Sequence, residues 1–374
     1  MQRIFHTPEG VRDIYGRECR QKKRLEDRIH EVFTRHGFED IETPSFEYFE
    51  VFSNEVGTIP SRDLFKFFDR DNNTLTLRPD FTPSVSRACA TYFSPDQKVV
   101  NLCYTGSAFV NSSSFQGRLK ETTQMGVEKM GDNHPLADAE ILATAIESLK
   151  ASGLSEFQVS IGQVEYFKSL LGEVSLNPEK EEQLRSLISQ KNYFAVEDLV
   201  REQGITGKTA EAFSMLPRMF GKSEVLSQAR SLATSPKATM AVQRLEEIYK
   251  LLSVYGYQDY VTFDFGMLSK YNYYTGIIFQ AYTYGSGEPL LKGGRYDELL
   301  RHFGKGAPSI GFVIVVDSLL SALQSEGFRE EEEDAGIVIP YGEADQEEAI
   351  RRACALRAQG KSAILVPVKE GPAL

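Results

Sequence analysis

Hydrophobic residues recur at helical spacing in two long stretches of the chain, Arg17 to His36 and about Asp138 to Ser152. The apolar positions are Leu25, Ile29, Val32 and Phe33 in the first stretch and Ile141, Leu142, Ile146 and Leu149 in the second. Gly37 stands where a helix C-terminal glycine belongs. Each stretch therefore predicts an amphipathic helix that packs one face on a core.

Short runs of alternating or β-branched residues predict strands between and after these helices. The first run, Phe38 to Pro44, follows the first helix directly and ends at a proline. Further strands are expected at residues 65–68, 74–77, 99–104, 157–161, 261–265 and 276–284. Because helices and strands mix without βαβ alternation over most of the chain, the pattern predicts an α+β fold with an antiparallel sheet.

Two parts of the chain depart from this mixed pattern. Asn177-Pro178 supplies a helix N-cap and a first-turn proline, and leucines at helical spacing follow. After an acidic run, the last residues read as strand, helix and strand, which is a single βαβ unit. The expected organisation is a core over 1–325 with a helical insertion at about 177–256, a linker over 326–335 and a short α/β tail over 336–374.

Composition changes this picture only slightly. Among 374 residues, acidic side chains outnumber basic ones and give a net charge of −11, which disfavours general binding of nucleic acids. No apolar run reaches the roughly 18 to 20 residues of a membrane span, and the N-terminus lacks the apolar core of a signal peptide. A cytoplasmic protein without a membrane partner is expected.

Cysteine and histidine spacing gives no sign of a metal centre. The four cysteines form no CxxC pair, and the five histidines form no HxxxH or HExxH pattern. The expectation is reduced, structural thiols and no bound metal.

Five segments combine charged, aromatic and glycine residues in patterns that suit a binding site. They are Thr7 to Asp13 (TPEGVRD), Leu77 to Thr82 (LRPDFT), Gly117 to Glu128, Asn272 to Gly276 (NYYTG) and Lys292 to Asp297 (KGGRYD). Singly, each has an ordinary explanation, such as a surface ion pair between Arg78 and Asp80 or a turn at the paired glycines. Gln124 and Glu128 would share one face of a strand, where an amide and a carboxylate could hold an ammonium group.

Taken together and in this order, the segments resemble the catalytic core of histidyl-tRNA synthetase over about residues 5 to 320. Further similar blocks are GFEDIETPSFE, GRLKETTQMGVEKMG, and GGRYDELL with PSIGF. The resemblance implies a class II aminoacyl-tRNA synthetase core, an antiparallel sheet flanked by helices, which dimerises through the first helix and the strand ending at Pro44. The tail resembles the beginning of that family's anticodon-binding domain.

The chain departs from the synthetase pattern at three positions where that family carries arginines. Val110, Ser269 and Ser318 occupy these positions. In the synthetases the arginines neutralise the charge that develops on ATP during adenylate formation. Loss of one such charge typically costs about 100- to 1,000-fold in rate. The resemblance therefore implies lost catalytic positions, no catalytic residues and no enzyme activity.

The positions at which the synthetases hold their amino acid are retained. By resemblance, the histidine-binding residues are Asp80, Thr82, Gln124, Glu128, Tyr273 and Tyr274. Two carboxylates with an amide suit an α-ammonium or an imidazolium group. Lys270 and Arg118 are the cations left to contact the ligand carboxylate.

A retained pocket without these arginines is typical of the regulatory subunits of ATP phosphoribosyltransferase, the first enzyme of histidine biosynthesis. Their LRPDxT block matches Leu77 to Thr82. This resemblance implies a non-catalytic subunit without a cofactor, a homodimer that joins the short-form catalytic subunit in a hetero-oligomer, with L-histidine as allosteric ligand and no tRNA partner. Two alternatives stay open: an active or fragmentary histidyl-tRNA synthetase, and a paralogue that binds another amino acid or serves as a scaffold.

Overall fold

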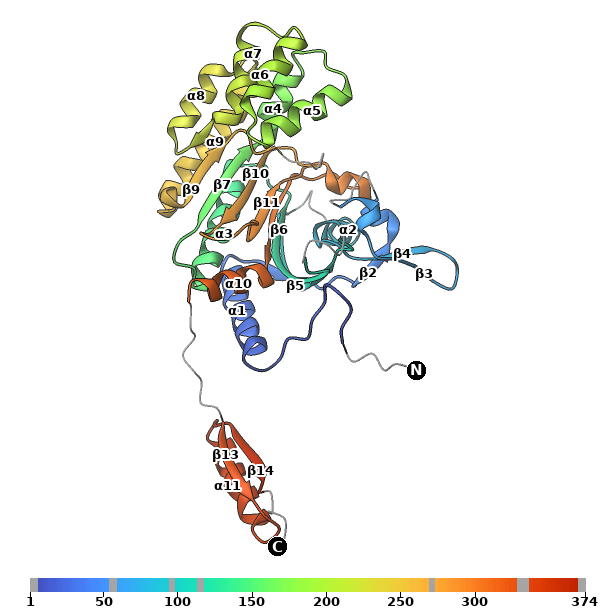
Figure 1. Cartoon of the computed structure of the whole chain (residues 1–374), viewed down its shortest axis with the longest axis vertical. Helices are drawn as coiled ribbons and strands as arrows, with labels where there is room; N and C mark the ends of the chain where they lie inside the picture. Colours follow the sequence, from blue (N-terminus) through green and yellow to red (C-terminus); the bar gives the residue numbers. More distant parts are fainter. Residues whose placement is uncertain are drawn as a thin grey trace. The chain divides into compact units, whose positions relative to one another are not determined.

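The computed structural model divides the chain into two compact units, residues 1–327 and 328–374 (Figure 1). It describes residues 6–53, 59–93, 98–112, 118–268, 273–327 and 336–368. Across these ranges, no helix has the length and apolar character that a bilayer span requires.

The first unit is built on a sheet that has nine strands in the described part of the chain. Their order is β1-β5-β6-β12-β11-β10-β7-β9-β8. In that order the bounds are Glu39–Asp40, Val100–Phe109, Glu121–Met130, Ser309–Val315, Leu291–Arg295, Ile277–Tyr282, Gln158–Gln163, Val261–Asp264 and Phe220–Gly221. From β5 to β7 every neighbouring pair is antiparallel, whereas β1–β5 and β7–β9 are parallel. The predicted α+β class with an antiparallel sheet is confirmed.

Two predicted amphipathic helices cover one face of this sheet. They are α1 (Gly16–Arg35) and α3 (Pro135–Ser152), and α10 (Val316–Ser325) packs beside them. Side chains alternate along a strand, so β6 directs Met125 and Val127 into the core beneath these helices. The same alternation sends Glu128 to the opposite face. There, α2 (Thr82–Tyr92) covers a separate, smaller core.

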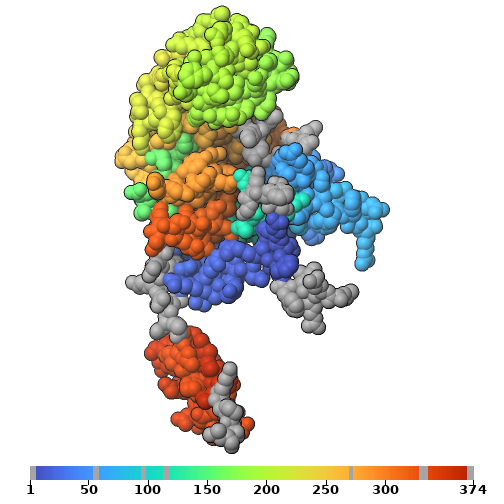
Figure 2. Space-filling model, in the orientation of Figure 1, coloured from blue at the N-terminus to red at the C-terminus, as the bar shows by residue number. Residues whose placement is uncertain are grey.

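The helical insertion forms a lobe at one end of the first unit, green to yellow in Figure 2. The helix α4 (Val164–Leu171) precedes the insertion. The helices of the insertion are α5 (Pro178–Ser189), α6 (Tyr193–Glu202), α7 (Gly207–Met215), α8 (Glu224–Leu232) and α9 (Pro236–Tyr255). Asn177 caps α5 as its sequence suggests, because its side-chain oxygen accepts a hydrogen bond from the Lys180 amide at 2.8 Å.

A small antiparallel sheet and the second unit complete the described structure. The small sheet has the order β2-β4-β3, with bounds Phe46–Tyr48, Thr74–Leu77 and Lys66–Phe68. The second unit consists of β13 (Ile337–Tyr341), α11 (Gln346–Ala358) and β14 (Ala363–Pro367), and its two strands are parallel. The strand, helix and strand expected for the tail are therefore present.

Candidate amino-acid-binding site

A buried carboxylate on β6 lies at the centre of the candidate site. The Glu128 side chain is 1% exposed. Its Oε1 accepts a hydrogen bond from Thr82 Oγ1 at 2.6 Å, and its Oε2 accepts one from the Tyr296 hydroxyl. Thr82 begins α2 and Tyr296 follows β11, so three elements that are distant in sequence meet at one carboxyl group.

Burial raises the pKa of Glu128 to about 8, because the charged form loses its water. The neighbouring Asp80 raises this pKa further, while hydrogen bonds from Thr82 and Tyr296 lower it. A cation placed against Glu128 would favour the ionised form and recover part of the desolvation cost. The site is therefore electrostatically suited to a cationic ligand group.

Four tyrosines surround this carboxylate. Tyr104 stacks on Phe81 with ring centroids 4.4 Å apart, and Tyr273 packs on Tyr274 at 4.3 Å and edge-on to Tyr296 at 6.1 Å. Burial, with Glu128 nearby, raises the pKa values of Tyr104, Tyr273 and Tyr296 well above the ordinary value. Their hydroxyls therefore stay protonated and can donate hydrogen bonds at neutral pH.

The cavity next to this cluster is small, about 40 Å³. Its lining includes Asp80, Thr82, Tyr273, Tyr274, Lys292 and Tyr296, together with glycine backbone of β11 and β12. A cavity needs about 10 to 15 Å³ to hold one water, so this one has room for a few waters, and an amino acid would have to displace side chains to enter. Glu128 does not itself line this cavity but is hydrogen-bonded to Thr82 and Tyr296, which do. A larger cavity of about 460 Å³ lies against α9 and is lined by neither of these two residues.

Gly311 on β12 lets the Glu128 carboxylate lie directly against the strand backbone. A Cβ atom at this position would overlap Glu128 Oε2 and the carbonyl oxygen of Val127. The absence of a side chain is therefore a requirement of the site.

Replacing Gly311 with alanine is expected to destabilise the chain by about 1 to 3 kcal/mol and to displace the Glu128 carboxylate, because the added methyl group overpacks a buried strand. Denaturant unfolding and histidine titration would measure the two effects. Gly287→Ala is the matched control, since a Cβ there meets no atom within 4 Å. Equal stability of the two variants would contradict the proposed packing.

Of two further predicted residues, Asp80 and Gln124, only the first lines the cavity. Asp80 lines the cavity, and its Oδ1 accepts a hydrogen bond from the Thr82 amide at 3.0 Å. Gln124 lies on the same strand as Glu128 but is not among the residues that line the cavity. Its Oε1 is buried without a hydrogen-bond partner among the described residues.

The structure does not bring the predicted carboxylate-binding cations together. Arg118 pairs with Glu288 at 2.6 Å on the exposed surface rather than lining the cavity. Lys270 and Ser269 lie outside the described residues. The cation that does line the cavity is Lys292, which the KGGRYD segment contains but which we did not predict to contact the ligand. Of the other predicted lost positions, Val110 follows β5 and Ser318 lies in the first turn of α10.

The surface ion pair considered for Arg78 and Asp80 is wrong. Arg78 is buried and donates hydrogen bonds to the carbonyl oxygens of Thr43 at 2.7 Å and Ser107 at 2.8 Å. Its guanidinium also stacks on the Phe81 ring at 3.9 Å. Backbone carbonyls can satisfy a buried guanidinium, so Arg78 supports the aromatic wall of the site from behind.

A buried ionic network holds the two tyrosine segments in place. Arg295, 2% exposed, donates to Asp138 Oδ1 through Nε at 2.9 Å and Nη2 at 2.6 Å, and to Asp297 Oδ1 at 3.1 Å. Thr275 Oγ1 donates to Asp297 Oδ2 at 2.8 Å. Tyr274 precedes Thr275, and Tyr296 lies between Arg295 and Asp297, so the network fixes the backbone of both tyrosines.

Comparison with known proteins finds relatives of this chain by sequence. The histidyl-tRNA synthetase family description matches residues 10–319. A protein from Acetivibrio thermocellus named ATP phosphoribosyltransferase regulatory subunit is 40% identical over 356 residues, which are 95% of this chain and 85% of that protein. A protein of the same name from Thermoanaerobacter pseudethanolicus is 37% identical over 96% of this chain and 93% of its own length. The chain belongs to the family of ATP phosphoribosyltransferase regulatory subunits.

Solved structures agree with this family. A Bacillus halodurans protein described as an ATP phosphoribosyltransferase regulatory subunit/histidyl-tRNA synthetase superimposes with a TM-score of 0.88 at 32% identity, covering 100% of this chain and 96% of that one. Histidyl-tRNA synthetase from Nostoc shares the fold, with a TM-score of 0.81 at 21% identity, covering 99% and 88%. The predicted class II synthetase-like fold and the predicted family are confirmed, and the family name ties the chain to histidine biosynthesis.

Proposed function

We propose that this chain is a non-catalytic subunit that binds L-histidine beside Glu128 and allosterically controls a short-form ATP phosphoribosyltransferase catalytic subunit. The observation that carries the ligand proposal is the buried Glu128 carboxyl, whose pKa is raised to about 8 and which is surrounded by tyrosine hydroxyls. The regulatory-subunit name of the relatives supports the partner.

In this proposal the cationic group of histidine pairs with Glu128 while Asp80 and the tyrosine hydroxyls orient it. The ligand enters by displacing the Tyr273–Tyr274 pair, which packs against Tyr296. That displacement gives the chain two arrangements whose balance histidine shifts. A coupling of this kind is typically worth about 1 to 3 kcal/mol.

Adenylate formation is not part of the proposed function. Val110 and Ser318 are uncharged where the synthetases carry arginines, and Arg118 is engaged with Glu288. Without cations against ATP the developing phosphate charge stays unbalanced. We therefore propose neither a catalytic role nor a tRNA partner, and we expect a homodimer formed through α1 and β1 within a cytoplasmic hetero-oligomer.

Calorimetric titration of the chain with L-histidine, alone and with ATP, tests the ligand. Histidine is expected to bind without any effect of ATP. A second assay follows phosphoribosyl transfer by a short-form catalytic subunit with and without the chain. The chain is expected to raise the rate and histidine to reduce it. ATP-dependent binding with release of pyrophosphate would instead support a histidyl-tRNA synthetase.

Arg118→Ala is expected to change histidine affinity by less than about twofold, since exposed ion pairs contribute about 0 to 1 kcal/mol and this one lies on the surface. The measurement is the same titration, in parallel with wild type. A loss of about tenfold or more would show that Arg118 leaves Glu288 to contact the ligand.

A further inference from the structure

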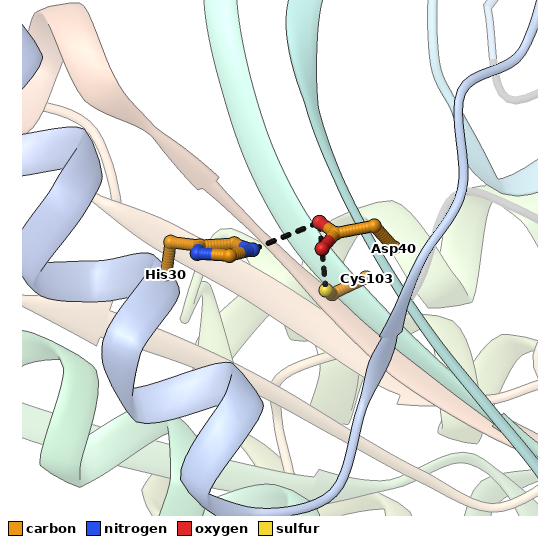
Figure 3. Close-up of side chains that lie close together, drawn as sticks. All are labelled: His30, Asp40 and Cys103. Atoms are coloured by element: carbon orange, nitrogen blue, oxygen red, sulfur yellow. Dashed lines mark hydrogen bonds and ion pairs between the residues drawn. The ribbon is translucent and has the colours of Figure 1, made fainter.

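Three side chains with metal-binding atoms meet between α1 and the edge of the large sheet (Figure 3). His30 lies on α1, Asp40 on β1 and Cys103 on β5. His30 Nε2 is 2.8 Å from Asp40 Oδ1, and Cys103 Sγ is 3.6 Å from the same oxygen. One ligand atom from each residue lies within 4.8 Å of the other two.

The backbone holds these three residues in fixed positions. Asp40 and Cys103 are direct partners in the parallel pairing of β1 with β5, and the Ile41 amide donates to the Cys103 carbonyl at 2.9 Å. Next to His30, Ile29 is fully buried in the core beneath α1. Ligands on rigid elements define a site more sharply than ligands on loops.

Asp40 lies between His30 and Cys103, and this arrangement is not that of a nucleophilic cysteine. A thiol is activated by an adjacent imidazole or cation, whereas Cys103 lies next to the Asp40 carboxylate. The Cys103 thiol donates to Asp40, so it is paired with a carboxylate rather than with a base that would activate it for attack. The cluster thus offers its atoms to a ligand rather than to a substrate.

We propose that His30, Asp40 and Cys103 bind one Zn²⁺ ion through Nε2, a carboxylate oxygen and Sγ, with water in the fourth position. Imidazole, carboxylate and thiolate are the ligand types that zinc takes in proteins. As the Zn–S bond forms, the thiol proton passes to solvent. In the single chain Asp40 is exposed and His30 partly so, which leaves room for the water. In the proposed homodimer the ion would lie at the interface that α1 and β1 form.

This site is independent of the proposed histidine site. Cys103 belongs to the core beneath α1, whereas Glu128 faces the opposite side of the sheet. A bound ion would join α1 to β1 and β5 and so stabilise the helix on the sheet. Sequence spacing gives no sign of it, because the ligands are ten and 63 residues apart rather than in one short motif.

Titration of the chelator-treated full-length chain with Co²⁺ tests the proposal. We expect one equivalent to bind, with the visible bands of tetrahedral Co²⁺ and a thiolate-to-cobalt charge-transfer band, and Zn²⁺ to displace it. Asp40→Asn and His30→Gln should weaken binding by about tenfold or more, and Cys103→Ser should abolish the charge-transfer band. Cys89→Ser is the matched control, because Cys89 is a buried thiol in the separate core beneath α2.

Circular dichroism of each metal-free variant establishes that it folds. Asp40 and His30 are exposed enough that their variants should fold even if Cys103→Ser does not. The proposal is overturned if the wild-type chain shows no charge-transfer band. It is also overturned if Asp40→Asn and His30→Gln bind Co²⁺ as tightly as wild type.

Discussion

Replacing Asp138 with alanine is expected to destabilise the first unit by about 3 to 5 kcal/mol, the cost of leaving a buried charge without its partner. Asp138 is fully buried and accepts hydrogen bonds from Arg295 and, through Oδ2, from Arg244 at 2.6 Å. Arg295 is itself 2% exposed, so water cannot replace the lost carboxylate. Denaturant unfolding measured by circular dichroism gives the change in free energy.

Glu246→Ala is the matched control for this variant. It breaks the pair between Arg230 and Glu246, both of which are partly exposed, and should cost at most about 1 kcal/mol. A change below about 1 kcal/mol for Asp138→Ala as well would show that the buried network adds little to stability. If the network positions Tyr274 and Tyr296 as proposed, the folded fraction of the Asp138 variant should also bind histidine more weakly.

The elements that could be predicted from sequence are those with one buried face. The first helix and α3 were expected within a few residues of their observed bounds because each follows an apolar stripe. By contrast, α2 was not anticipated. Its residues from Pro83 to Ala90 are nearly all buried and include several small or polar side chains, so no stripe distinguishes one face.

One predicted strand is much shorter than expected, for a reason that lies elsewhere in the chain. The segment from Phe38 to Pro44 forms a strand only at Glu39–Asp40. The carbonyl oxygens of Thr43 and Pro44 accept hydrogen bonds from Arg78, 35 and 34 residues later, instead of from a neighbouring strand. Local alternation cannot show such a competing partner.

The same limit applies to the candidate site. Resemblance supplied Asp80, Thr82 and Glu128. In the structure Asp80 and Thr82 line one cavity, and Thr82 is hydrogen-bonded to the Glu128 carboxyl group. Tyr104 and Tyr296 were missed, although Tyr296 stood in the KGGRYD segment. Both face Glu128 only because β5 pairs with β6 and the end of β11 lies across β12, and nothing in their local sequence reports these pairings.

Replacing Glu128 with glutamine is expected to make the ligand-free chain more stable at alkaline pH. The pKa of Glu128 rises from an ordinary 4.5 to about 8 on folding. Its contribution to stability is therefore fully present below about pH 4.5 and is lost as the pH rises through about 8, at about 1.4 kcal/mol per pH unit between these limits. Glutamine has no such loss, so its advantage should grow by about 3 to 5 kcal/mol between pH 5 and 8.

Unfolding curves at pH 5, 6.5 and 8 measure this difference, with Glu288→Gln as an exposed control that should show no comparable trend. Histidine binding by the same Glu128 variant should fall by about 100-fold or more, because a cationic ligand loses a buried charged partner. The stability effect follows from burial of the carboxyl alone, so the loss of histidine binding is the result that distinguishes a ligand contact from a residue kept for packing. A Glu128→Gln chain that binds histidine like wild type would remove Glu128 from the binding site, whatever its stability.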